Sequence, residues 1–88
     1  MRRFEFDWDD GNREHIARHH VAPEEAEEVF RSRFHLLHGR VGRYVALGQT
    51  ETGRYLFCAF ERIGPGLIRV VTARDMEPWE RKLYKRKR

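Results

Sequence analysis

The stretch Ile68–Arg74 (IRVVTAR), followed directly by Asp75–Lys87 (DMEPWERKLYKRK), decides the fold. The first part is an apolar run with the length of a strand. The second part is highly charged, and Pro78 is compatible with a helix only in its first turn. Trp79 and Leu83 lie about one turn apart and predict an apolar edge that faces inward. The chain is therefore expected to end with a strand that leads straight into a basic helix.

Four expected strands precede that helix, and short turns that contain glycine separate them. The strands are Phe34 to His38, Arg43 to Gly48, Arg54 to Glu61 and Leu67 to Ala73. Connections of this length favour hairpins, so a four-stranded antiparallel meander is predicted. The last two strands are apolar at both odd and even positions. Burial therefore does not fix their register or the face that each of their residues occupies.

The first third of the chain predicts one strand and two helices. Phe4 to Asp9 alternates apolar and acidic residues, as a strand with one buried face does. A helix is expected from about Arg13 to His19, with a turn and cap at Asp10 to Asn12. A second helix begins at Pro23 and carries an apolar stripe that ends at Phe30. The order of one strand, two helices, four strands and a basic helix is an α+β plan.

The 88 residues predict a single domain, 1–88, because a chain of this length buries enough apolar surface for one core. With 40% hydrophobic and 36% charged residues, including six Phe, the core depends on aromatic bulk. The single cysteine, Cys58, lies in an apolar run, where a small buried hydrophobe is expected rather than a disulfide or a nucleophile. No apolar run has the length of a membrane span or of a signal peptide, so a cytoplasmic location is expected.

Charge is distributed unevenly along the chain. Residues 1–33 carry nine acids and six bases, residues 34–74 carry two and six, and residues 75–88 carry three and six. The excess of positive charge therefore belongs to the C-terminal two-thirds. Such a surface attracts polyanions, and nucleic acid is the commonest candidate. The alternative is a charged tail that only keeps the protein soluble.

A set of short markers spans nearly the whole chain. They are Phe4 to Asp9, Arg18-His19, Val21, Glu24 to Ala26, Val29-Phe30, Gly42-Arg43, Gly48, Gly53-Arg54, Leu56, Arg69 to Arg74, Glu80 and Tyr84. In this order and at this spacing the chain resembles BrnT-type toxins of bacterial toxin-antitoxin pairs. The chain departs from that pattern at Arg18 and His20, where the family usually has Lys and Gly, and at Thr72, where it usually has Ser.

The resemblance implies a RelE-like fold and a ribonuclease of a type II toxin-antitoxin system. It implies cleavage of messenger RNA, free or on the ribosome, which inhibits translation. Attack of a 2′-hydroxyl on the adjacent phosphate would leave a 2′,3′-cyclic end without a metal or other cofactor. The implied partner is a BrnA-like DNA-binding antitoxin that covers the toxin and represses the shared operon. A toxin homodimer inside that complex is also implied.

Metal-free RNA cleavage needs a base, an acid and cations that stabilise the extra charge on phosphorus. Arginine suits the last role, because its planar fork binds two phosphate oxygens and stays protonated. Four arginines at or near strand ends are the candidates: Arg43, Arg54, Arg69 and Arg74. Neighbouring strands are expected to bring them to one surface, with Arg74 the first choice. Each is equally compatible with an ordinary solvated position.

Three further side chains are candidates for moving protons. Glu80 and Tyr84 lie one helical turn apart and share a face. His19 matches the helix-one histidine of the family, and histidine titrates near neutral pH. The alternative is that Glu80 pairs with a neighbouring arginine such as Arg74 and that Tyr84 packs on the sheet. His15 and His19 have the spacing of metal ligands but lack a third, so no metal site is expected.

The C-terminal helix mixes cations with aromatic side chains. Arg81, Lys82 and Lys85 are expected to bind RNA phosphates together with Arg43 and Arg69. The same run equally suits an edge that docks acidic residues of an antitoxin, and the two uses are left open. The rival interpretation of the chain is a non-catalytic RNA-binding or partner-binding module with the same fold.

Overall fold

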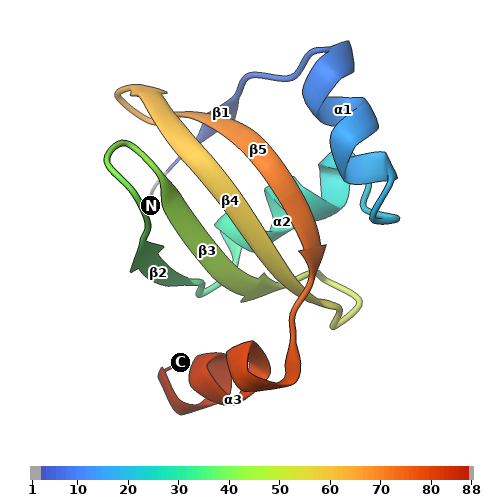
Figure 1. Cartoon of the computed structure of the whole chain (residues 1–88), viewed down its shortest axis with the longest axis vertical. Helices are drawn as coiled ribbons and strands as arrows, with labels where there is room; N and C mark the ends of the chain where they lie inside the picture. Colours follow the sequence, from blue (N-terminus) through green and yellow to red (C-terminus); the bar gives the residue numbers. More distant parts are fainter. Residues whose placement is uncertain (1–2, 88) are drawn as a thin grey trace.

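The computed structural model describes residues 3–87 as three helices and a five-stranded sheet (Figure 1). The elements are β1 (Glu5–Phe6), α1 (Asp10–Ala17), α2 (Pro23–Arg31), β2 (His35–His38), β3 (Tyr44–Gln49), β4 (Tyr55–Gly64), β5 (Leu67–Asp75) and α3 (Pro78–Lys87). The strand order is β1-β5-β4-β3-β2. Helices α1 and α2 cover one face, and α3 lies at one end of the other face.

The α+β prediction is confirmed, and the predicted N-terminal strand joins the meander in one sheet. Strands β2 to β5 form the expected antiparallel meander. Strand β1 adds a fifth strand, parallel to β5, so the sheet is mixed. The Asp7 N–H donates to the Ile68 carbonyl at 2.8 Å, just past the end of this short strand. Alternating Phe and acidic residues indicated a buried face, but they carried no information about the strand's partner or direction.

Helix α1 begins three residues earlier than predicted and ends before His19. The Asp9 side chain accepts a hydrogen bond from the Asn12 N–H, and the Asn12 side chain accepts one from the Asp9 N–H. This reciprocal capping box makes Asp10 to Asn12 the first turn of the helix rather than a turn outside it. At the other end His20 has φ 61°, in the left-handed region that usually takes glycine after a helix.

The buried side chain of Asn12 joins α1 to the sheet. Its Nδ2 donates to the Asp7 carbonyl and to the Val70 carbonyl, each at 3.0 Å. The residue is 4% exposed, and both its amide donors and its oxygen have partners. One amide therefore fixes the start of α1 against β5 and the end of β1.

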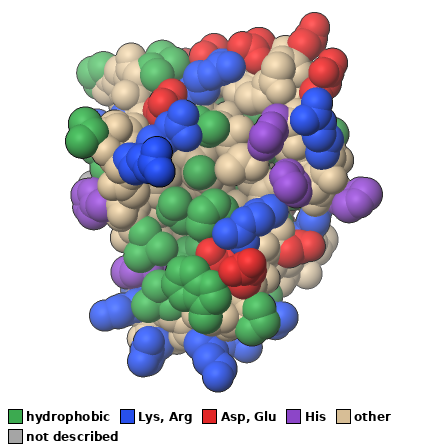
Figure 2. Space-filling view, in the orientation of Figure 1, with side chains coloured by type: hydrophobic (Ala, Val, Ile, Leu, Met, Phe, Trp, Pro, Cys, Tyr) green, Lys and Arg blue, Asp and Glu red, His purple; other side chains and the backbone are tan. Residues whose placement is uncertain are grey.

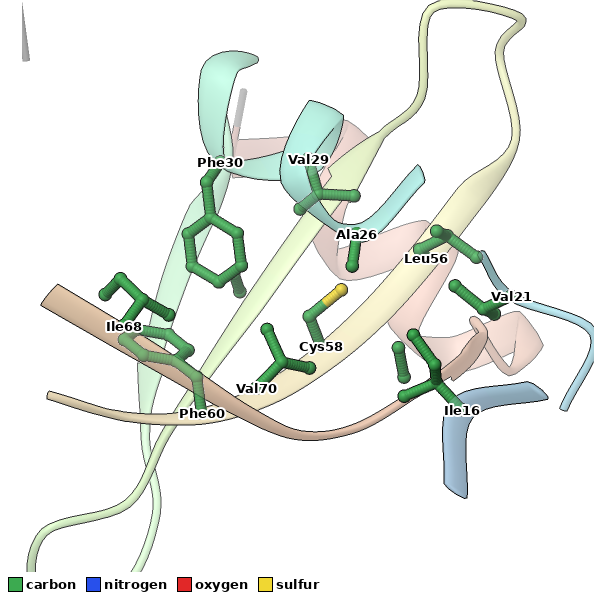
Figure 3. Packing of buried hydrophobic residues seen from close by; sticks show 12 residues of the cluster. Ile16, Val21, Ala26, Val29, Phe30, Leu56, Cys58, Phe60, Ile68 and Val70 are labelled. Carbon is green, nitrogen blue, oxygen red and sulfur yellow. The ribbon is translucent and has the colours of Figure 1, made fainter. Parts of the chain in front are cut away.

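The main core lies between the sheet and helices α1 and α2 (Figure 3). Phe30 of α2 packs edge-to-face on Phe60 of β4, with ring centroids 5.0 Å apart, and α1 contributes Ile16. Cys58 is fully buried in this cluster, and burial raises the pKa of its thiol to about 12. The expectation of a small buried hydrophobe at this position is confirmed. Gly48 lies beneath α2, where an added Cβ would stand 2.9 Å from a Val29 methyl carbon.

A bulge in β5 changes which residues share a face. Ala59 pairs with Thr72 and Phe60 pairs with Val70, so Val71 is an extra residue between them. Val70 and Ala73 are three positions apart, yet both enter the main core. Side chains on either side of the bulge therefore do not follow simple alternation. No sequence pattern predicted this irregularity.

Helix α3 packs through one of the two residues predicted for its inward edge. Tyr84 and Glu80 are its buried residues, and Tyr84 joins Leu47 and Met76 in a second cluster, with Leu83 packed against it. Trp79 is 57% exposed, so the expected inward edge of Trp79 and Leu83 is wrong for Trp79. The reason is that Glu80 binds Arg74, which turns the face of Glu80 and Tyr84 toward the sheet and leaves Trp79 outside. None of the helices within residues 3–87 has the length and apolar character needed to cross a bilayer.

Replacing Asn12 with alanine removes the donors to two backbone carbonyls, one of them buried on β5. We expect the free energy of unfolding of Asn12→Ala to fall by about 2 to 3 kcal/mol, because buried acceptors would lose their partners. Urea denaturation measures the loss. Arg13→Ala, at the exposed neighbouring position, is the control and should change stability by less than about 0.5 kcal/mol. Equal stability of the two variants would contradict the anchoring role.

The carboxylate of Asp9 predicts a specific acid sensitivity. Its pKa is lowered from the ordinary 3.8, first by the hydrogen bond from the Asn12 backbone and also by Arg69. A lowered pKa contributes stability that is present above the unfolded pKa and is lost as the pH falls through the folded pKa. Asp9→Asn keeps a capping residue but removes this titration. Its unfolding midpoint should decline less than that of the wild type between about pH 5 and about pH 2.

Candidate functional site

The face of the sheet opposite α1 and α2 is open over most of its area, and Figures 1 and 2 look onto it. We call this surface the open face, and its residues come from four strands. They are Leu37 of β2, Val45 of β3, Tyr55, Phe57, Ala59 and Glu61 of β4, and Arg69, Thr72 and Arg74 of β5. Figure 2 shows hydrophobic side chains in the middle of this view and Lys and Arg side chains around them. Basic side chains gather at the end where α3 lies.

The β5 bulge places Arg69 and Arg74 on the same face. Residues five positions apart point to opposite sides of a regular strand. Here Arg69 lies opposite Glu61, and Arg74 lies opposite Phe57, which shares a face with Glu61. The extra residue Val71 therefore brings the two arginine side chains back to the same face of the sheet. Two of the four predicted arginines are therefore brought to the open face by a feature that the sequence did not predict.

Arg74 is held by a buried carboxylate. Its two terminal nitrogens donate to the two oxygens of Glu80 at 2.9 and 3.1 Å, and its guanidinium carbon lies 3.9 Å from the centroid of the Phe57 ring. The hydrogen bond that Arg74 donates to Glu80 raises the pKa of Arg74. Glu80 is 1% exposed and Tyr84 is 4% exposed, and the Tyr84 ring packs on Tyr55. The pairing and packing that the sequence left as alternatives are present.

Arg54 lies at the edge where the two helices meet. Its guanidinium donates to Asp75 at 2.9 Å, to Glu25 of α2 at 3.1 Å, and to the His20 carbonyl at 2.6 Å. The hydrogen bond to Asp75 is the first cause of its raised pKa. Arg74 also donates to the backbone carbonyl of Asp75, at 3.1 Å. Arg54 and Arg74 therefore share Asp75 and connect α1, α2, β5 and α3.

A row of alternating charge crosses the opposite end of the sheet. Arg43 donates to Glu61 at 2.9 Å, and Glu61 lies opposite Arg69. Arg69 in turn pairs with Asp7 and Asp9, each at 3.0 Å, and the hydrogen bond to Asp7 is the first cause of its raised pKa. The expected convergence of all four arginines is therefore replaced by two pairs. Arg43 lies with Arg69, and Arg54 lies with Arg74, at opposite ends of β4 and β5.

A shallow hollow of about 290 Å³ lies at the Arg43 and Arg69 end of the sheet. Both arginines line it together with Glu61 and with His15 from α1. The residues that line the hollow do not include His19, the predicted histidine, whose ring lies 5.8 Å from that of His15. His19 contributes its backbone carbonyl to Arg54 instead, at 3.4 Å.

The basic residues predicted on α3 do share a surface. Arg81 lies over the Tyr55 ring at 4.3 Å, and the Lys85 Nζ lies 5.3 Å from the same centroid. Arg81, Lys82 and Lys85 also line one shallow depression with Met76. This α3 cluster adjoins the open face through Tyr55. Within residues 3–87 we find no three His, Cys, Asp or Glu side chains grouped to hold a metal ion.

His15, Glu61 and Phe57 were not predicted from the sequence as site residues. His15 was considered only as a metal ligand, and Glu61 only as the last residue of a strand. The available signal was the strand pairing itself, because a hairpin between β4 and β5 sets Glu61 opposite Arg69. Without the position of the bulge that signal was ambiguous.

The Arg74–Glu80 pair should stabilise the attachment of α3. Arg74→Met leaves a carboxylate that is 1% exposed without its cation, and we expect the free energy of unfolding to fall by about 2 kcal/mol or more. Adding Glu80→Gln removes the unpaired charge and should recover part of the loss. Urea denaturation of both variants measures the coupling. A single variant as stable as the wild type would show that the pair contributes nothing to folding.

Comparisons with known proteins bear on this geometry. The fold is similar to the crystal structure of the Brucella abortus ribonuclease toxin BrnT, with a TM-score of 0.67 and 18% sequence identity. The match covers 88% of this chain and 99% of that one, and at this identity the likeness concerns the fold. No curated protein matches the chain. Residues 8–80 match the family model for the ribonuclease toxin BrnT of type II toxin-antitoxin systems. The chain therefore belongs to the BrnT family of ribonuclease toxins.

Proposed function

We propose that this chain cleaves RNA without a metal ion, by attack of a 2′-hydroxyl on the adjacent phosphate, and that this cleavage inhibits translation. The observation that carries the proposal is the position of Arg69 and Arg74 on one uncovered face of the sheet. Guanidinium groups fixed in this way bind phosphate oxygens and stabilise the charge that develops on them. Membership of a ribonuclease toxin family supports the same chemistry. The RelE-like character of the fold remains a prediction from the resemblance.

RNA would run along the open face from the Arg69 end to α3. Arg43 and Arg69 would bind phosphates at one end, and Arg81, Lys82 and Lys85 would bind them at the other. Aromatic rings at Phe57 and Tyr55 lie between the two ends, under the cations of Arg74 and Arg81. Stacking surfaces beside cations suit single-stranded RNA.

The residues predicted to act in catalysis differ in burial, and we assign their roles accordingly. Glu80 and Tyr84 lie beneath the surface, so we assign them to positioning Arg74 rather than to contact with RNA. Arg54 would have a comparable role, because it holds the residue that follows Arg74. His19 is exposed and remains a candidate for moving a proton.

The family implies an antitoxin partner, and we propose a BrnA-like DNA-binding protein that presents acidic residues to the α3 cluster and covers the open face. A toxin homodimer inside that complex is part of the same proposal. Binding of this kind would block RNA and would weaken as the salt concentration rises.

A second candidate function is RNA binding without cleavage. The observation in its favour is that Arg43, Arg54, Arg69 and Arg74 each already have a carboxylate partner. An RNA phosphate must compete with these carboxylates for the arginines. Such competition is compatible with modest RNA affinity as well as with catalysis.

An assay of the cleavage of mixed-sequence RNA in EDTA, with and without ribosomes, distinguishes a ribonuclease from a non-catalytic RNA-binding module. We expect the wild type to cut RNA in EDTA and to leave 2′,3′-cyclic ends. Arg74→Gln combined with Glu80→Gln, which avoids an unpaired buried charge, should cut at least about tenfold more slowly, because the open face would lose a cation that binds an RNA phosphate. Arg31→Ala, an exposed arginine on α2, is the matched control and should cut at the wild-type rate. Intact RNA under every condition would leave the binding module as the function.

A further inference from the structure

We propose that the reaction centre is the hollow formed by His15, Arg43, Glu61 and Arg69, with Glu61 as the general base and His15 as the general acid. The proposal rests on the RNA-cleaving function proposed above and names the groups that perform it. None of the predicted proton-moving residues belongs to this set. His15 comes from α1, Glu61 from β4 and Arg69 from β5, while Arg43 directly precedes β3, and the four side chains line one concave site.

The geometry of the hollow is fixed from two sides. On the sheet, the carboxylate of Glu61 lies between two arginines, 2.9 Å from the Arg43 Nε and directly across the strand pair from Arg69. On the helix, Asn12 ties the first turn of α1 to the carbonyl of Val70, the residue after Arg69. His15 follows Asn12 by three positions, so it reaches the edge of the same hollow.

The side chains have the chemistry that metal-free cleavage of RNA requires. A carboxylate accepts the proton of the 2′-hydroxyl, and a protonated imidazole supplies the proton that the leaving oxygen needs. Two guanidinium groups stabilise the extra charge on the phosphorane oxygens. Both arginines are part-exposed, with 49% and 30% of their side chains accessible, so phosphate can reach them.

The reaction balances within this set of groups. Glu61 takes the proton of the 2′-hydroxyl as the 2′-oxygen forms a bond to phosphorus. The bond from phosphorus to the 5′-oxygen of the next nucleotide breaks, and that oxygen receives a proton from the His15 imidazolium. The products are a 2′,3′-cyclic phosphate and a 5′-hydroxyl. Glu61 then holds one proton more and His15 one fewer, and exchange with water restores both.

Two other parts of the chain within residues 3–87 lack one or more of these components. Glu80 and Tyr84 are 1% and 4% exposed, and the Glu80 carboxylate is already bound by Arg74. A larger hollow of about 710 Å³ is lined by phenylalanine rings and by Arg3, Arg33 and Arg62, but no carboxylate or imidazole lines it. The His15 hollow, in contrast, combines a carboxylate, an imidazole and two arginines.

The first experiment measures cleavage of an RNA oligonucleotide that the wild type cuts, in EDTA. We expect His15→Gln and Glu61→Gln each to slow cleavage by about a hundredfold or more. His38→Gln on β2, whose position faces away from the open face, and Glu14→Gln on the exposed side of α1 are the matched controls and should cut at the wild-type rate. His19→Gln tests the neighbouring histidine and should retain most of the activity. Unfolding midpoints of all variants show whether each one is folded.

The second experiment separates the acid from the base. The same oligonucleotide is made with sulfur in place of the 5′-oxygen at the cleaved bond, because a thiolate leaves without a proton. On this substrate His15→Gln should cut within about tenfold of the wild type, whereas Glu61→Gln should remain at least about a hundredfold slower. A merely structural role for His15 would slow both substrates equally.

The outcomes distinguish the two proposals. A wild type that cuts no RNA overturns the proposed function. A wild type that cuts RNA while His15→Gln and Glu61→Gln match their controls overturns this reaction centre and leaves the function intact. Equal losses for His15→Gln on the oxygen and sulfur substrates overturn the assignment of His15 as the acid.

Discussion

The amide of Asn12 is the interaction on which the arrangement of this protein depends. It is buried, and its hydrogen bonds reach the start of α1, the end of β1 and the middle of β5. Elements that are far apart in the chain therefore meet at one side chain. A buried amide is stable only when all its groups are satisfied, so the contact specifies one arrangement rather than adding general cohesion. The position of His15 beside Arg69 follows directly from it.

The carboxylate partners of the four candidate arginines fix the position of each guanidinium but also compete with RNA for it. Each of the four candidate phosphate ligands is held by at least one carboxylate, which fixes its geometry before a substrate arrives. The same carboxylates neutralise part of the charge that would attract RNA. Arg54 and Arg74, whose partners connect four elements, are most directly involved in folding. Arg43 and Arg69, unlike Arg74, have no buried partner. Their carboxylate partners are 37% to 55% exposed, so these two arginines are better placed to exchange a carboxylate for a phosphate.

Much of the fold was predictable from the sequence because turns and helix starts have local causes. Glycine-containing turns separated the strands of the meander, and Pro23 marked the start of α2. The fifth strand was not predictable as a partner of β5, because two residues of parallel pairing leave little local pattern. The predicted inward position of Trp79 was wrong, since the face of α3 that meets the sheet is set by the contact of Glu80 with Arg74, which is not a local property of the helix.

The candidate site was harder to predict, because its composition depends on contacts between elements that are distant in the sequence. Charge and residue type identified Arg43, Arg69 and Arg74, and these lie on or beside the open face. Which side chains stand next to them depended on the strand register and on Asn12, and neither is a local property. Glu61 and His15 were therefore passed over, although a carboxylate and an imidazole are ordinary partners for metal-free chemistry.

The bulge at Val71 has a consequence for how this sequence can change over time. Surface turns such as the one around Gly42 have room for inserted or deleted residues. In β5, loss of Val71 would remove the bulge and leave Arg69 and Arg74 four positions apart, still on one face of a regular strand. Loss or gain of one residue next to a bulge that stays in place would instead exchange the outward and inward sets on one side of the changed position. An arginine would then be forced among the aromatic rings, or Ala73 and its neighbours would be turned to water. The bulge is therefore a site at which this strand can change its length by one residue without exchanging its faces.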